Sequence, residues 1–295
     1  MAVVDAQLHN PAPWLPWDED DRAVRNLLQT ELVLAAMDAV GVDAVLLDPL
    51  GDYRWAEYAA QQFPARFGSV RYVDPDAPDL DEQVARLRSR PGGLAVRVLV
   101  TSTLSGDNRA RFEAGGFDSV FGSCERHEVP AFVFVGGEAG LVESVARAYP
   151  GLTLVVDHLA IPQPPVQAAD DPPFARLPNL LALAKFPNVA VKVTGAPCLS
   201  LEPYPYRDLW PHLHRIVDAF GPERVMWGSD IHRIHGRIGW HVRYPTAYTH
   251  SRRHTYAEAL GYLLHTEELG PADKEQIVGA TIRRLLRWPR PASVS

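Results

Sequence analysis

The sequence predicts a single-domain α/β protein built as an eight-stranded parallel (β/α)8 barrel, the TIM-barrel class, over residues 1–295. Short apolar runs alternate with longer amphipathic stretches, which is typical of parallel strands joined by helices. The 295 residues are 46% hydrophobic, enough for one large core, and barrels of this length occur as one domain. Neither a GxGxxG turn nor a GxxxxGK[S/T] loop is present, so eight alternations favour a closed barrel over an open nucleotide-binding sheet.

Eight apolar runs are the predicted strands, and most lack polar alternation, as expected of strands covered on both faces. They lie at 3–9, 44–47, 68–73, 95–100, 131–135, 152–158, 189–193 and 224–230. The amphipathic stretches between them include 32–40, 55–63, 80–88, 141–149, 177–186 and 209–220. Several of these predicted helices end at a glycine or proline, such as Gly41 and Pro150. Two long insertions, 161–173 and 232–253, follow strands at the carboxyl end of the barrel, where this fold builds its active sites.

Composition and charge argue against several classes of partner. The formal net charge is −7, and the basic residues are dispersed, so the sequence predicts no nucleic-acid binding. No run of about 18 apolar residues could span a bilayer, and no positively charged leader precedes the first strand. We therefore expect no membrane partner and a cytoplasmic location. The two cysteines, Cys124 and Cys198, form no CxxC pair and are interpreted as packing residues.

Polar residues stand at the ends of three predicted strands. Gln7 and His9 share one side of the first strand because side chains alternate along a strand. His158 ends the sixth strand and Asp230 the eighth. The first and eighth strands of a closed barrel are neighbours, about 4.8 Å apart. The sequence therefore predicts that His9, His158 and Asp230 meet at the mouth of the barrel, with Gln7 beside them.

Five segments carry a family resemblance that covers nearly the whole chain. They are Val4–His9, Val156–Leu159 with Pro162 following, Val191–Gly195, Glu223–Asp230 and Gly279–Leu286. In this order and spacing they resemble the amidohydrolase superfamily. Within it, the chain is most similar to the amidohydrolase-2 branch that contains fuconolactonase-like and pyrone-dicarboxylate lactonases. Aminocarboxymuconate-semialdehyde decarboxylase and its relatives are more distant.

The resemblance implies a set of metal-ligating positions that this chain fills only in part. The family's first strand ends in His-x-His, its fifth and sixth strands each supply a His, and its eighth supplies an Asp. Here Gln7 replaces the first His, and residues 131–137 contain none. An amide oxygen is a poor zinc ligand, and the pyrone-dicarboxylate lactonases work without metal. We therefore favour a site with no metal cofactor. The alternative keeps a divalent ion such as Zn²⁺ on His9, His158 and Asp230.

The predicted activity is hydrolysis of a small carbonyl compound, a lactone or similar cyclic ester, with Asp230 taking a proton from the attacking water. His158, His9 and the Gln7 amide would stabilise the charge that develops on the carbonyl oxygen. One alternative is a metal-dependent non-oxidative decarboxylase of the same family, with His158 and Asp230 as ligands. Another is a catalytically inactive barrel that binds a ligand, because two ligand positions are missing.

Further charged residues are candidate substrate contacts. Arg97 and Lys192 lie inside apolar strands, where a charge is costly unless it is paired. Either would bind a substrate carboxylate or oxyanion, or else form a salt bridge inside the barrel. His232 and Arg233 begin a cationic insertion beside Asp230, which suits an anionic small-molecule substrate. Homo-oligomerisation is left open by the sequence.

Overall fold

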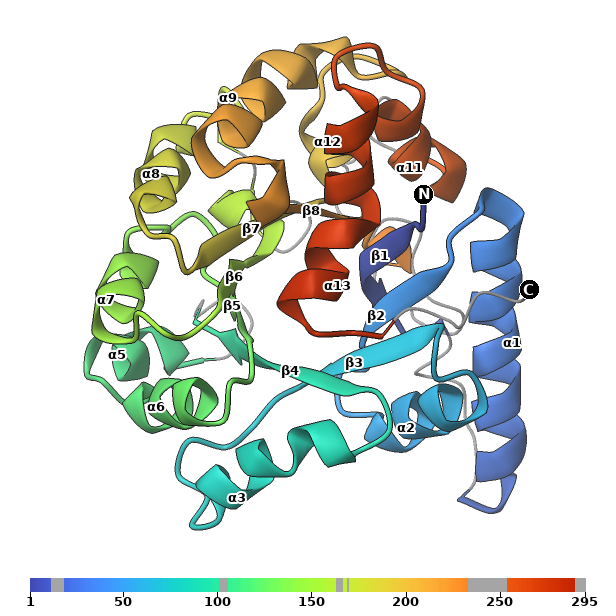
Figure 1. The fold of residues 1–295 in the computed structure, drawn as a ribbon, viewed down its shortest axis with the longest axis vertical. Helices are drawn as coiled ribbons and strands as arrows, with labels where there is room; N and C mark the ends of the chain where they lie inside the picture. The colour runs from blue at the N-terminus through green and yellow to red at the C-terminus, as the bar shows by residue number, and fades with distance from the viewer. Residues whose placement is uncertain (12–18, 101–105, 163–166, 169, 233–253, 290–295) are drawn as a thin grey trace.

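The computed structural model describes residues 1–11, 19–100, 106–162, 167–168, 170–232 and 254–289. Eight parallel strands follow one another in chain order, each paired with the next, as Figure 1 shows. They are β1 Val4–His9, β2 Ala44–Asp48, β3 Phe67–Arg71, β4 Gly93–Leu99, β5 Ala131–Phe134, β6 Leu154–Val156, β7 Val189–Thr194 and β8 Val225–Gly228. The Asp230 N–H donates to the Gln7 carbonyl at 2.9 Å, so the chain leaving β8 lies against β1 and nearly closes the ring. The predicted barrel is confirmed.

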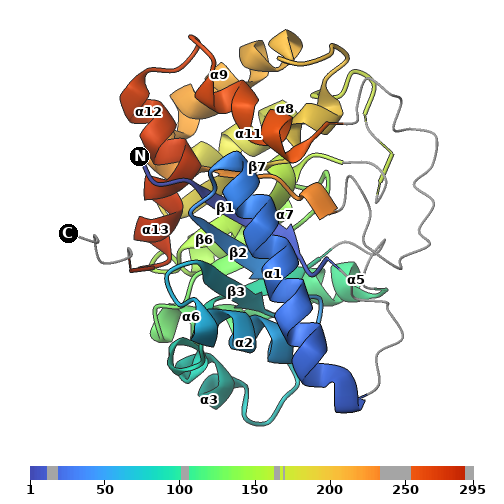
Figure 2. The same ribbon diagram turned by 90° about the vertical axis from the view of Figure 1, so that its right-hand side faces the viewer.

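Helices surround the barrel, as the two views in Figures 1 and 2 show. The α-helices are α1 Arg22–Val40, α2 Tyr53–Gln62, α3 Leu80–Ala85, α5 Asn108–Glu113, α6 Asp118–Arg126, α7 Leu141–Ala148, α8 Leu177–Leu181, α9 Trp210–Phe220, α11 Tyr256–Leu264, α12 Pro271–Glu275 and α13 Thr281–Leu285. Helix α1 begins ten residues before the predicted start, and it ends at Gly41, whose φ of 77° is left-handed. None of the described helices combines the length and the apolar character needed to cross a bilayer.

Strands β6 and β8 each end two residues before their predicted ends, and both lead into the candidate site. Strand β6 ends at Val156, and His158 lies in a short turn with a left-handed φ of 51°. Strand β8 ends at Gly228, and Asp230 has a φ of 52°. A left-handed residue cannot continue a strand, so the backbone turns at each of these positions. The backbone turns, and not the alternation of side chains along a strand, therefore set the direction of these two side chains.

The core has two parts. Most buried apolar side chains fill the space between the strands and the surrounding helices. A second cluster fills the barrel interior, with Phe132 and Met226 among its members, and Trp288 from the C-terminal segment packs with it. Gly279, just before α13, lies against the start of the chain, where an added Cβ would sit 1.9 Å from the Ala2 carbonyl oxygen. This close approach requires glycine at that position.

Candidate active site

The structure brings the three predicted residues together although they are far apart in the sequence. His9 Nε2 lies 3.1 Å from Asp230 Oδ1, and His158 Nδ1 lies 4.0 Å from Asp230 Oδ2. All three side chains are buried, Asp230 with 1% exposure. His158 also packs edge-on against Phe134 of β5, with ring centroids 5.3 Å apart. A carboxylate therefore lies between two imidazoles at the carboxyl end of the barrel.

Hydrogen bonds settle how His9 is oriented. Its Nδ1 lies 2.9 Å from the backbone oxygen of Asp48, which can only accept, so Nδ1 carries the proton and donates. Its Nε2 faces Asp230 and also lies 3.3 Å from the Gln7 amide nitrogen. A histidine whose far nitrogen is held by a carbonyl keeps one ring orientation. His9 thus presents Nε2 to the space beside Asp230.

Lys192 and Arg97 both form ion pairs inside the barrel. Lys192 Nζ lies 2.7 Å from Asp157 Oδ1, and Arg97 Nε donates to Asp157 Oδ2 at 2.7 Å. Arg97 also pairs with Asp48, whose carboxylate accepts a hydrogen bond from Tyr72 at 2.9 Å. Burial alone would raise the pKa of Asp157, but the neighbouring charges of Arg97 and Lys192 hold it below its ordinary value. The two cations and two carboxylates neutralise one another. This is the salt bridge inside the barrel that the sequence allowed as an alternative to a substrate contact.

A further buried carboxylate, Asp5, supports the turn that carries Asp230. It accepts hydrogen bonds from the Ser229 N–H at 2.8 Å, the Tyr256 hydroxyl at 2.9 Å and the Gln7 N–H at 3.0 Å. Burial raises the pKa of Asp5 to about 6, against the opposing effect of these hydrogen bonds. Asp5 therefore ties β1, the end of β8 and α11 together immediately behind Gln7 and Asp230.

The remaining predicted contacts have separate outcomes. His232 is half-buried, and its Nδ1 lies 2.5 Å from the His9 carbonyl oxygen, so it lies beside the site. Arg233 lies outside the described residues, as does the rest of the cationic insertion through residue 253. Sequence reasoning missed Asp5, Asp48 and Asp157. The available signal was an acidic residue within or directly after an apolar strand, the same signal that identified Arg97 and Lys192.

The described donors do not fit a zinc ion. Zinc prefers four tetrahedral ligands drawn from imidazole, thiolate and carboxylate. His9 and Asp230 lie close enough to share an ion, but Gln7 turns its amide nitrogen towards them, and β5, Ala131–Phe134, contains no histidine. Across the described ranges, no three His, Cys, Asp or Glu side chains gather in a metal-binding arrangement. We therefore derive no reaction step through a metal.

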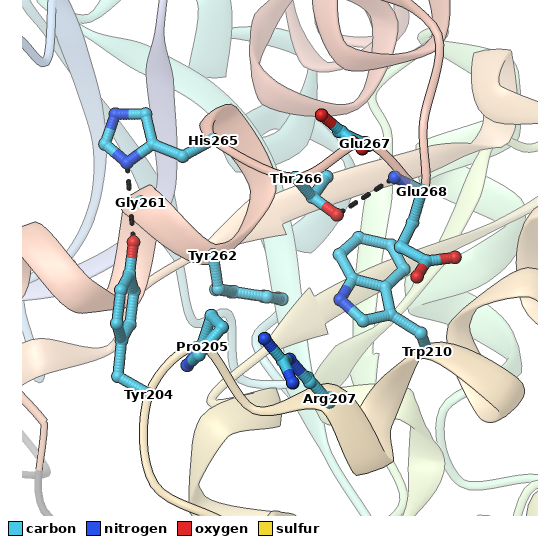
Figure 3. A pocket seen from close by; sticks show the side chains of 10 residues that line it. All are labelled: Tyr204, Pro205, Arg207, Trp210, Gly261, Tyr262, His265, Thr266, Glu267 and Glu268. Atoms are coloured by element: carbon cyan, nitrogen blue, oxygen red, sulfur yellow. Dashed lines mark hydrogen bonds between the residues drawn. The ribbon is translucent and has the colours of Figure 1, made fainter.

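A cavity of about 440 Å³ lies elsewhere, between the segment that leads into α9 and the end of α11 (Figure 3). Tyr204, Arg207 and Trp210 face Tyr262 and His265 across it. The Tyr204 hydroxyl lies 3.4 Å from His265 Nδ1. Asp230, His9 and His158 do not line this cavity, so it is separate from the candidate active site.

Two curated relatives match parts of the chain. An L-fucono-1,5-lactonase from Burkholderia ambifaria is 36% identical over 99 residues, which is 32% of this chain and 32% of the relative. A 4-sulfomuconolactone hydrolase from Hydrogenophaga intermedia is 27% identical over 176 residues, 58% of this chain and 53% of the relative. The matches thus span about a third and about half of these relatives.

A solved structure and a family model match nearly the whole chain. The crystal structure of an amidohydrolase from Burkholderia multivorans, with bound zinc, is 21% identical with a TM-score of 0.73 and covers 98% of this chain and 100% of its own. At that identity the likeness shows the fold. The family model described as amidohydrolase matches residues 4–288. The match includes all eight strands and the turns that carry His158 and Asp230, and the chain belongs to this amidohydrolase family.

Proposed function

We propose that the chain hydrolyses a lactone or similar cyclic ester, with Asp230 as the general base. The observation that carries the proposal is the buried Asp230 carboxylate, 3.1 Å from His9 Nε2 and 4.0 Å from His158 Nδ1. The names of both curated relatives, a lactonase and a lactone hydrolase, support this class of substrate. Catalysis is assigned to Asp230, His158 and His9.

The reaction balances without an added cofactor. The oxygen of a water molecule attacks the lactone carbonyl while Asp230 accepts one of its protons. Negative charge develops on the former carbonyl oxygen, and a ring N–H of His158 would donate a hydrogen bond to it. The ring C–O bond then breaks, and the leaving alkoxide takes the proton from Asp230. The product is the open-chain hydroxy acid, and the carboxylate is regenerated.

The roles of the other polar residues follow from their contacts. Gln7 and His9 line the space beside Asp230, so they would hold the water or the substrate. His232 lies at the same edge and would contact substrate, and we extend this role to Arg233, which follows it in the sequence. Arg97 and Lys192, with Asp157 between them, would act by holding this arrangement in place. An anionic small-molecule substrate stays a prediction from the cationic insertion.

The decarboxylase alternative needs a metal on His158 and Asp230, and the donor set described above does not favour one. One experiment tests both the lactonase and the decarboxylase activity. A panel of small lactones, aliphatic esters and aromatic carboxylic acids is incubated with the protein, and proton release and carbon dioxide release are measured on the same preparation. We expect proton release with lactones, unchanged after treatment with a chelator. Carbon dioxide release that the chelator abolishes would overturn the proposal. No turnover of any compound would favour the inactive ligand-binding alternative.

A further inference from the structure

Lys192 is surrounded by acceptors in the barrel interior, with 1% of its surface exposed. Its Nζ lies 2.7 Å from Asp157 Oδ1, 2.5 Å from Gln7 Oε1 and 3.4 Å from the Ala6 carbonyl oxygen. An ammonium group has three N–H donors and no acceptor, which matches three surrounding acceptors. The Phe132 ring adds a cation–π contact, with its centroid 4.9 Å from Nζ. Burial lowers the pKa of Lys192 from its ordinary value, and the contact with the Asp157 carboxylate opposes this and favours the charged form.

The ammonium determines which end of the Gln7 amide reaches the active site. Because Lys192 can only donate, the amide end 2.5 Å away must be the oxygen. The amide nitrogen then lies 3.3 Å from His9 Nε2. A donor therefore faces the space beside His9 and Asp230, where a metal ion would require an acceptor.

The position is also unfavourable for a metal ion on electrostatic grounds. The Lys192 charge lies one amide group away from the point where His9 and Asp230 approach each other. Like charges repel strongly in a poorly solvated interior. The Asp157 carboxylate reduces this repulsion but is not available as a ligand, because Arg97 and Lys192 contact both of its oxygens.

We propose that Lys192 serves as the built-in cation of this site and excludes a divalent metal, by its charge and by turning the Gln7 amide donor towards His9. Lys192 is thus a positioning residue that acts through Gln7. The proposal does not require lactone hydrolysis, because it concerns metal affinity. The expected metal content can be wrong while lactone turnover is observed, and lactone turnover can be absent while the metal content is as expected.

The test is to create the metal site by substitution. Gln7→His adds the missing imidazole, and Lys192→Met removes the charge while keeping the length of the side chain. We expect little binding of Zn²⁺ or Co²⁺ by the wild type and by either single variant. The double variant should bind one equivalent, with an affinity at least about tenfold above that of Gln7→His alone. Metal analysis after dialysis measures the stoichiometry, and Co²⁺ absorption bands report the ligand geometry without reference to activity.

Two further variants keep the result interpretable. Lys192→Gln retains a hydrogen-bond donor to Asp157 and replaces Lys192→Met if the latter does not fold. Lys185→Met, at an exposed lysine paired with Glu143 at 2.9 Å, removes the same charge away from the site and should leave metal affinity unchanged. One tightly held equivalent in the wild type would overturn the proposal. Equal metal affinity of folded Gln7→His and the folded double variant would overturn it as well.

Discussion

Asp157→Asn tests whether the buried charges inside the barrel depend on one carboxylate. Asp157 is fully buried and contacts Arg97 and Lys192 at 2.7 Å each. Removing one partner from a buried ion pair costs about 3–5 kcal/mol, because a charge is left without compensation. A loss of 1 kcal/mol lowers the Tm of a large domain by about 2–4 °C. We therefore expect Asp157→Asn to lower Tm by roughly 10 °C in scanning calorimetry at neutral pH.

Asp38→Asn is the matched control for this measurement. Asp38 pairs with Arg66 at 2.6 Å, but its side chain is 62% exposed. Exposed pairs contribute about 0–1 kcal/mol, so its Tm should change by only a few degrees. Because the pKa of Asp157 is held below its ordinary value, its contribution is present above about pH 4 and is lost as the pH falls further. Equal Tm values for the two variants at pH 7 would refute the reasoning.

Three further perturbations act on stability. The pKa of Asp5 is raised from 3.8 to about 6, so its protonated form is favoured in the folded state, and the free energy of unfolding should fall as the pH rises between these values. Asp5→Asn should lack this slope in urea unfolding, and parallel curves for variant and wild type would contradict it. Gly279→Ala places a Cβ 1.9 Å from the Ala2 carbonyl oxygen and should cost about 1–3 kcal/mol by the same measurement. Tyr72→Phe removes the hydrogen bond that the hydroxyl donates to Asp48 and the one that it accepts from Arg97, and should cost about 1–3 kcal/mol, whereas an unchanged midpoint would show that the two bonds contribute nothing.

The order of elements could be predicted because each strand and helix has its own local pattern. All eight strands begin within a few residues of their predicted positions, since apolar β-branched runs mark them directly. The ends of β6 and β8 could not be predicted. His158 and Asp230 adopt left-handed backbone conformations that are rare for residues other than glycine. Contacts from β1, which is distant in the sequence, hold the turn at Asp230.

The candidate site, like the fold, could be predicted only in part. Polar residues at strand ends identified His9, His158 and Asp230, because the barrel topology alone brings those ends together. The pairing of Arg97 with Asp48 and Asp157 could not be derived, since it depends on the barrel's dimensions and on the side-chain conformations in its interior. The sequence permitted a salt bridge or a substrate contact for Arg97 and Lys192 and could not choose between them.

The central claim is that Asp230 acts as the base in lactone hydrolysis, and Asp230→Asn tests it most directly. The amide keeps the shape of the side chain but cannot accept a proton from water in the same way. Asp218→Asn, at an exposed position on α9, is the control for the same substitution. General-base catalysis contributes about 10²–10⁴-fold to rate. We predict that kcat for an accepted lactone falls by about 10³-fold in folded Asp230→Asn and is unchanged in Asp218→Asn. Equal kcat values in Asp230→Asn and wild type would contradict the account.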